Sequence, residues 1–204
     1  KGEVMGESFL KKFHRKHRCG DNHACYDGAL KEMQGGRKHT HWIWWVFPQV
    51  SGLGSSYRAK KYAIQSLQEA VDFLEDPVLG AHYCEITEVV MKQICREGVS
   101  LPHLFRKEID VRKFISSITL FQWVASRQQS LPVEEVEPPV LDNDYGESGG
   151  MSPLNYGRLL DFCKEVIMEA DRQGFPPCHK TLEWIAQQQQ GSALTRPVGD
   201  LKDE

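Results

Sequence analysis

The sequence has no uninterrupted apolar run of the roughly 18–20 residues that a membrane-spanning helix requires. Its longest run extends from Trp42 to Phe47, and residues 1–7 contain no hydrophobic core of a signal peptide. We therefore expect no membrane association. The run itself predicts a short buried helix or strand.

The familiar catalytic signatures are also missing. No Ser-His-Asp set, HExxH pattern or paired-carboxylate motif is visible, so hydrolase chemistry of these kinds has no support. The glycines match neither the phosphate-binding P-loop nor the dinucleotide fingerprint. No cofactor is predicted.

The composition is that of an ordinary globular protein. The 204 residues are 40% hydrophobic and 26% charged, which suits one domain with a sizeable core. A formal charge of −3 and a pI near 6.3 argue against general nucleic-acid binding. Residues 1–40 nevertheless hold a local basic patch, made of Lys11, Lys12, Arg15, Lys16, Arg18, Arg37 and Lys38.

The cysteines are scattered without the spacing of a disulfide framework. We therefore expect reduced thiols and a cytoplasmic protein, with the nucleus as the alternative. One cluster mixes zinc-type ligands within residues 14–25 but lacks the paired knuckle of structural zinc sites, so it predicts a solvated basic segment and no metal. The six cysteines are Cys19, Cys25, Cys84, Cys95, Cys163 and Cys178, and the cluster is His14, His17, Cys19, His23 and Cys25.

Apolar residues recur with a period near 3.6 in nearly every long segment, while strand signals are weak. This pattern predicts a compact all-α domain of about six to eight helices. The expected helices cover 21–33, 55–74, 78–97, 111–126, 152–171 and 181–189, with a short turn at 100–105. Asp110 is placed to cap the fourth of these helices.

The predicted organisation is a basic arm over 1–20, one domain over 21–190 and a disordered tail over 191–204. Inside the domain, residues 128–152 carry six acidic residues, prolines and glycines but no basic residue. Such a segment cannot bury enough apolar surface to order itself, so it predicts a flexible acidic loop.

A first polar group lies in residues 37–56. Glycines at Gly52 and Gly54 allow a tight turn, and the first amides of the following helix would lie beside Ser55 and Ser56, which is a geometry that binds anions. An ordinary serine cap is the alternative. Lys38, His39 and His41 lie shortly upstream.

The tryptophans and histidines of this group also allow two interpretations. Trp42 and Trp44 could stack on a purine or nicotinamide ring, or they could belong to a core helix that forms the floor of a pocket. His39 and His41 diverge by about 200° on a helix and cannot easily chelate one metal. His41 is a candidate general base or a candidate hydrogen-bond donor to phosphate. The alternative is that its imidazole caps a helix.

A second polar group lies on the helix that begins near Asp110. One edge carries Asp110, Lys113 and Ser117, with Ser116 and Thr119 nearby. This edge could close a pocket, with Asp110 as an acid–base candidate. Otherwise it is a helix cap with an ion pair worth a few tenths of a kcal/mol.

Two long motifs resemble the domain-of-unknown-function family 1810. They are residues 36–49 with Gly52-Leu53-Gly54, and residues 110–121; weaker matches extend the resemblance over 22–190 apart from the acidic loop. The resemblance implies a mostly helical single domain and no established activity. The shared polar positions that it implies are Lys38, His41, Gln49, Gly52, Gly54, Tyr62, Asp110, Lys113, Ser116, Ser117 and Thr119.

Three features depart from this resemblance. The acidic loop looks inserted, the basic arm looks added, and Cys178 stands where similar sequences often have an acidic residue before Thr181-Leu182. The role of Cys178 is therefore open.

Two functional hypotheses follow. In the first, the polar groups meet around a phosphate-bearing small molecule such as a nucleotide or ADP-ribose, with or without catalysis by His41 and Asp110. In the second, the polar groups are structural, and the chain binds a protein partner through its basic arm or acidic loop. The predicted ligand-binding residues are Lys38, His39, Trp42, Trp44, Gln49, Gly52, Gly54, Ser55, Ser56, Tyr62, Lys113, Ser116, Ser117 and Thr119, with no metal ligand.

Overall fold

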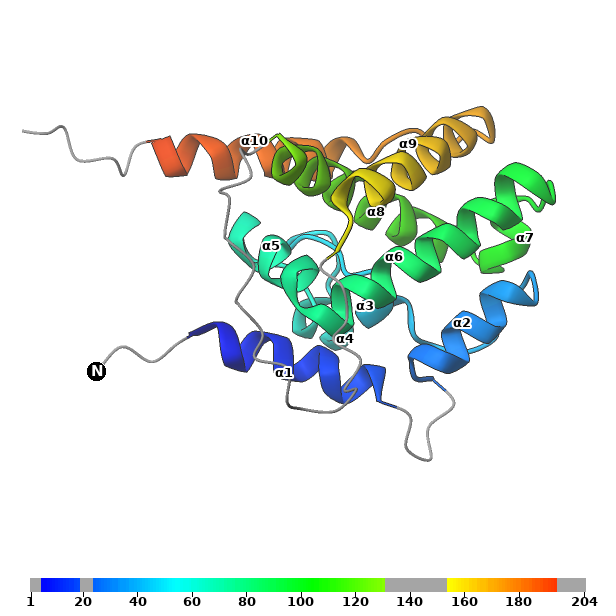
Figure 1. Ribbon diagram of the computed structural model, residues 1–204, viewed down its shortest axis with the longest axis horizontal. Coiled ribbons are helices and arrows are strands. Elements are labelled where there is room, and N and C mark those ends of the chain that lie inside the picture. The colour runs from blue at the N-terminus through cyan, green and yellow to red at the C-terminus, as the bar shows by residue number, and fades with distance from the viewer. Residues whose placement is uncertain (1–4, 19–23, 131–153, 194–204) are drawn as a thin grey trace, which may run out of the picture.

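The protein is all-α, as the apolar periodicity predicts (Figure 1). The computed structural model describes residues 5–18, 24–130 and 154–193. In these ranges it contains ten α-helices, one π-helical segment and an isolated β-bridge between Val50 and Ile64. The helices are α1 (Met5–His17), α2 (Tyr26–Gln34), α3 (Ile43–Val46), α4 (Tyr57–Lys61), α5 (Leu67–Glu75), α6 (Pro77–Met91), α7 (Leu101–Phe105), α8 (Glu108–Gln129), α9 (Tyr156–Arg172) and α10 (His179–Ala193), with the π-helical segment η1 (Lys92–Arg96) directly after α6.

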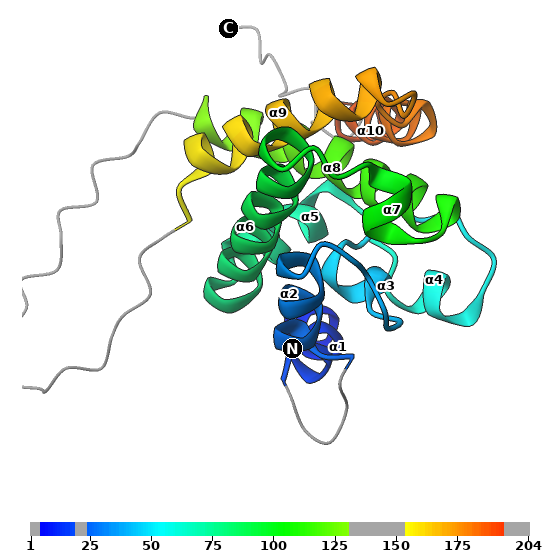
Figure 2. The same cartoon turned by 90° about the vertical axis from the view of Figure 1, so that its right-hand side faces the viewer.

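The core surrounds α8, which packs against α5, α7, α9 and α10 (Figure 2). Aromatic rings fill the space between α3, α6 and α8: Phe47 lies 4.8 Å from Phe114 and 5.6 Å from Tyr83, measured between ring centroids. Because α8 is covered on several sides, even its hydroxyl side chains Ser116, Ser117 and Thr119 are buried.

Residues 5–17, which lie in the stretch expected as a basic arm, form α1. This helix is amphipathic: Phe9 and Phe13 are buried in the core, while Arg15 is exposed. Phe13 contacts Phe73 of α5 with ring centroids 5.1 Å apart. At least this part of the predicted arm therefore packs against the domain.

Several helix boundaries differ from those predicted. The single helix expected over 55–74 is two helices, because Ser56 caps α4, Ser66 caps α5, and the bridge at Ile64 separates them. Helix α8 begins at Glu108, so Asp110 lies inside its first turn and is not its cap. Helix α9 begins after Asn155, whose side chain accepts from the Arg158 amide.

The single-turn helices α3, α4 and α7 raise the helix number above the six to eight expected. Such turns are set by tertiary contacts and carry too few residues for a periodic signal.

The cysteines correct another expectation. Cys84, Cys95, Cys163 and Cys178 are free thiols, but Cys25 is disulfide-bonded, so the prediction of six reduced thiols was wrong. Spacing along the chain does not report which residues folding brings together.

No described helix has the length and apolarity to cross a membrane. Among the described residues, no group of three or more His, Cys, Asp or Glu could hold a metal ion. Most of the predicted acidic loop lies outside the described residues.

Candidate anion-binding site

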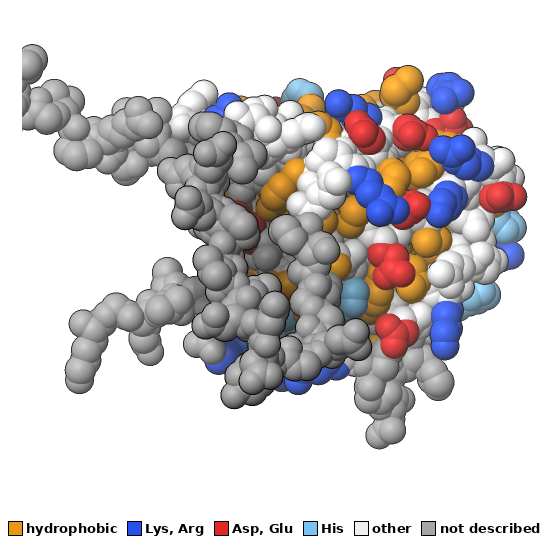
Figure 3. Space-filling view, viewed as in Figure 1, with side chains coloured by type: hydrophobic (Ala, Val, Ile, Leu, Met, Phe, Trp, Pro, Cys, Tyr) orange, Lys and Arg blue, Asp and Glu red, His pale blue; other side chains and the backbone are white. Residues whose placement is uncertain are grey.

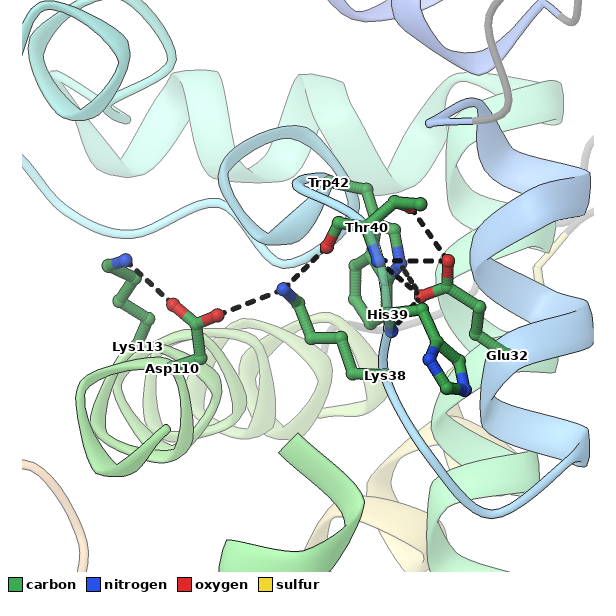
Figure 4. Close-up of polar contacts among 7 residues, drawn as sticks. All are labelled: Glu32, Lys38, His39, Thr40, Trp42, Asp110 and Lys113. Carbon is green, nitrogen blue, oxygen red and sulfur yellow. Dashed lines mark hydrogen bonds and ion pairs between the residues drawn. The ribbon is translucent and has the colours of Figure 1, made fainter. Parts of the chain in front are cut away.

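The loop after α2 is held in place by Glu32. Its carboxylate accepts hydrogen bonds from the backbone amides of His39 (2.7 Å) and Thr40 (3.0 Å), and from the indole Nε1 of Trp42 (2.6 Å) (Figure 4). Burial raises the pKa of the Glu32 carboxyl, but these donors outweigh it and the net pKa is below the usual value. Glu32 therefore remains a carboxylate that fixes the start of α3.

This loop places Lys38 beside α8, where three charged side chains form a chain of ion pairs. Lys38 Nζ lies 2.9 Å from Asp110 Oδ2, and Lys113 Nζ lies 2.8 Å from Asp110 Oδ1 (Figure 4). Lys38 also donates to the Thr40 carbonyl at 2.7 Å. The two polar groups of the sequence thus meet in space.

The ion pairs determine the protonation state of Asp110. Burial raises the pKa of this carboxyl, but hydrogen bonds from Lys113 and Lys38 outweigh burial and bring the pKa below its usual value. Asp110 is therefore ionised at neutral pH, with one carboxylate oxygen bound to each lysine. Its proposed part in proton transfer stays a prediction.

Beside these ion pairs lies a cavity of about 620 Å³, which we call the Trp44 cavity. It opens between the loop before α4, the first turns of α8 and the start of α10. Its lining residues are Trp44, Gln49, Leu53, Gly54, Ser55, Ser56, Ala59, Ile109, Arg112, Lys113, Ser116, Cys178 and Lys180.

Local chemistry explains the shape of the loop side. Gly52 has a φ of +87°, a conformation that L side chains rarely adopt. A Cβ atom on Gly54 would lie 2.6 Å from the Cβ of Ala59, so only glycine lets α4 approach the loop this closely. These two glycines therefore shape the wall that carries Ser55 and Ser56.

The lining of the Trp44 cavity is positively charged. Arg112, Lys113 and Lys180 contribute cations, whereas no carboxylate belongs to the lining. The Lys113 ammonium lies 4.4 Å from the Trp44 ring centroid, and the Arg58 guanidinium lies 5.4 Å from it. Two of the cations have partners, since Arg112 pairs with Glu108 and Lys113 with Asp110.

Seven of the predicted ligand-binding residues line this cavity. They supply an indole, an amide, backbone amides, hydroxyls and an ammonium, and the Ser116 hydroxyl is buried and lies 2.9 Å from that of Thr181. They are Trp44, Gln49, Gly54, Ser55, Ser56, Lys113 and Ser116.

Other predicted residues are buried and satisfied within the protein. Trp42 has no exposed surface, so its ring cannot stack on a ligand in this structure. Lys38 is only 4% exposed and bound as described above. Ser117 bonds to the Tyr83 hydroxyl, and Thr119 donates to the Ile115 carbonyl while it accepts from the Cys178 amide.

The remaining predicted residues lie away from the Trp44 cavity. His41 and Tyr62 line a separate hollow on the other side of α4, together with Arg58. His39 is exposed, and its role as a ligand-binding residue, like that of His41 in catalysis, stays a prediction.

Sequence reasoning did not single out three residues that shape this region. Glu32 carries no motif, and Arg112 reads as an ordinary exposed helix residue. Lys180 follows Cys178 at the start of α10, and only folding brings it opposite α4. For this wall of the cavity, the one sequence signal was the pair of basic residues, His179 and Lys180, at the start of the helix after Cys178.

Comparison with known proteins defines the family. A model described as "Protein of unknown function (DUF1810)" matches residues 10–136. The chain is a member of the DUF1810 family. The DUF1810 match covers both polar groups and part of α1, and it stops before Cys178, which precedes α10, and Lys180 of α10, both of which line the cavity.

No curated protein matches this DUF1810 chain. Among solved structures it is similar to the conserved hypothetical protein Rv1873 from Mycobacterium tuberculosis, with 26% sequence identity and a TM-score of 0.58. The similarity covers 87% of this chain and 96% of that one. The DUF1810 fold is thus shared, and that protein's description names no activity.

Proposed function

We propose that this protein binds a phosphate-bearing small molecule, of the nucleotide or ADP-ribose type, in the Trp44 cavity. The observation that carries the proposal is a lining with Arg112, Lys113 and Lys180 but no carboxylate. Arg112 and Lys113 share their charge with Glu108 and Asp110, whereas Lys180 forms no ion pair within the described residues, so the cavity keeps a net positive lining. A concave surface lined by one sign of charge attracts ions of the other sign and raises their local concentration.

The other groups of the lining suit the rest of such a ligand. A volume of about 620 Å³ lies in the range of roughly 300–1,000 Å³ typical of small-molecule sites. Apolar contact comes from Leu53 and Ile109, and hydroxyls at Ser55 and Ser56 can donate to phosphate or ribose oxygens.

Trp44 supplies further support. Its indole Nε1 is buried and has no acceptor within the described residues. A buried donor without a partner is costly, so such a group beside a cavity favours a ligand or water that accepts from it. The Trp44 ring also holds Lys113 and Arg58 over its surface, which positions these cations near the ligand.

Thermal-shift measurements with ADP, ADP-ribose, AMP and inorganic phosphate test the proposal. A ligand at 100 times its Kd adds about 2.7 kcal/mol of stability, or roughly 5–10 °C in Tm for a domain of this size. We expect Lys180→Ala to weaken binding roughly tenfold, which corresponds to about 1.4 kcal/mol. Lys180 is exposed, so this variant should fold normally.

The matched control is Lys107→Ala, which removes an exposed lysine outside the lining. Its response to ligand should equal that of the wild type. If no phosphate-bearing compound stabilises the folded wild type, or if the Lys180 and Lys107 variants respond equally, the proposal is wrong.

The second candidate function is a protein-interaction module. The observation that favours it is that Lys38 and Asp110 are buried and bind one another, while Glu32 binds the backbone of the loop and the Trp42 indole, so these polar groups hold the structure together. If this is the function, deletion of residues 128–152 should abolish capture of a partner protein while the circular dichroism spectrum and Tm stay unchanged. Substitutions in the Trp44 cavity should then leave that capture unchanged.

A further inference from the structure

A second basic hollow lies across α4 from the Trp44 cavity. It has a volume of about 720 Å³ and lies between α1, the loop at 40–41 and α4. We call it the Tyr57 hollow and define it by Arg15, Lys16, His41, Tyr57, Arg58 and Lys61. Its walls come from helices that are more than forty residues apart in the chain, so folding creates it.

No carboxylate of the described residues compensates the charge of the Tyr57 hollow. Arg15, Lys16, Arg58 and Lys61 line it, no carboxylate does, and none of the four forms an ion pair within the described part of the chain. The face drawn in Figure 3 differs, because basic and acidic side chains are interspersed there. Glu88, for example, pairs with both Lys92 and Arg158.

Repulsion between the cations of the Tyr57 hollow extends to Lys12, a neighbouring residue on α1. The pKa of Lys12 is lowered, first by burial and also by the charge of Lys61, although Glu69 opposes both effects. Like charges held close together destabilise the folded state, and a bound polyanion reduces that repulsion.

The rim of the hollow carries an exposed aromatic ring. Tyr57 is 76% exposed, the largest value among the exposed large apolar side chains of the described residues. Lys61 Nζ lies 5.4 Å from its ring centroid and 3.3 Å from its hydroxyl. The ring is thus available for stacking directly beside a cation.

We propose that the Tyr57 hollow binds single-stranded nucleic acid. Proteins bind single strands by combining a positively charged groove, which contacts phosphates, with aromatic rings on which bases stack. Arg15, Lys16 and Lys61 would contact successive phosphates, and Tyr57 would stack on a base. A duplex is a rigid rod that cannot enter a hollow of this size, whereas an unpaired strand can. The net charge of −3 does not oppose this, because the local charge governs the contact.

Fluorescence anisotropy with a labelled twelve-nucleotide single strand tests the proposal in the full chain. We expect Lys61→Ser to weaken binding and to reduce the slope of log K against log salt by about 0.7, the value for one phosphate contact on a single strand. Tyr57→Ala should weaken binding roughly 5- to 100-fold by loss of stacking while the slope stays unchanged. Tyr57→Phe should restore it.

Two controls separate this site from the rest of the surface. Lys164→Ser removes an exposed lysine of α9 that lies outside both cavities, and Lys180→Ser changes the Trp44 cavity but not the Tyr57 hollow. Both should leave oligonucleotide affinity unchanged, so this proposal and the small-molecule function can fail independently.

Three results would overturn the proposal: equal affinity of the wild type and the Lys61 variant, tighter binding of duplex than of single strand, or indifference to Tyr57→Ala. The last would mean that the hollow attracts any polyanion, such as inorganic polyphosphate, and recognises no base.

Discussion

At the scale of single residues, the decisive contrast is between charges that are paired and charges that are not. Lys38 and Asp110 lie in the two motifs that suggest a ligand, yet each is buried and they bind one another at 2.9 Å. Lys113, with 15% of its side chain exposed, is the member of this network that faces the cavity. The buried pair therefore supports the site, while Lys113 belongs to it.

This division of roles predicts a stability effect. Lys38→Met should lower the free energy of unfolding by about 2–4 kcal/mol, because a buried carboxylate that loses a partner is costly. The double variant Lys38→Met/Asp110→Leu should be more stable than the single variant, since it leaves no buried carboxylate with Lys113 as its one remaining partner. Urea denaturation measures both. Arg112→Met breaks an exposed pair with Glu108 and serves as the control, with a change below about 1 kcal/mol.

If the single variant costs no more than the Arg112 control, or if the double variant is the least stable, the ion pair is not what holds the loop to α8. The Glu32 hydrogen bonds would then be the main restraint on this loop.

At the scale of elements, the sequence predicts the long amphipathic helices well and the short ones poorly. Helices α2, α6, α8 and α9 follow from apolar stripes, since a helix that buries one face must repeat its apolar residues. The break at Ile64 could not be predicted, because it depends on a bridge to Val50 that no local signal encodes.

Packing also determines which parts of the candidate site could be predicted from the sequence. The meeting of residues 37–56 with residues 110–119 was predicted, because both motifs combine charges, hydroxyls and turn residues that are costly unless they serve a purpose. The Asp110–Lys113 ion pair follows from the spacing of these residues on one helix. The pairing of Asp110 with Lys38 was not predictable, since spacing along a helix leaves partners from other elements undefined. Lys180 of α10 and Glu32 of α2 entered the region only through packing.

The close contact between α5 and α6 allows a specific prediction. Helix α6 approaches the end of α5 so closely that a Cβ atom on Gly80 would lie 2.0 Å from the Leu74 carbonyl oxygen. Gly80→Ala should therefore destabilise the protein by more than 2 kcal/mol, although alanine is the better helix former by about 1 kcal/mol. Gly157→Ala on α9 is the control, because its nearest neighbour is the end of the flexible Gln129 side chain at 3.1 Å.

Urea denaturation of the two glycine variants checks this contact. A Gly80 variant as stable as the Gly157 variant would show that α5 and α6 can separate at little cost, and that the junction at Asp76 does not constrain them.

At the scale of the whole molecule, α1 is attached to the rest through a stack of rings. His17 lies 5.3 Å from His82 of α6, measured between ring centroids, and His82 lies 3.6 Å from Tyr26 of α2. His17 Nε2 donates to the Trp45 carbonyl at 2.9 Å, which leaves its Nδ1 to accept from His82 Nδ1 at 3.0 Å. Burial favours the neutral form of His17, in which one ring nitrogen donates and the other accepts.

The stack of the His17, His82 and Tyr26 rings should make the free energy of unfolding depend on pH. The pKa of His17 is lowered from 6.5 to about 4, mainly by burial and with smaller contributions from His82 and His14, while the Trp45 carbonyl and Asp76 act in the opposite direction. Burial also lowers the pKa of His82. Because the unfolded chain takes up the proton first, the contribution of His17 is complete above pH 6.5 and is lost as pH falls toward 4. The loss is about 3 kcal/mol.

Chemical denaturation between pH 7 and pH 4 of the wild type and His17→Phe measures this contribution. Phenylalanine keeps a ring in the stack but cannot titrate, so the stability of the variant should fall by about 3 kcal/mol less over this range. His39→Gln, at an exposed position, should follow the wild type. Parallel pH profiles for the wild type and the His17 variant would mean that α1 leaves the domain before His17 is protonated.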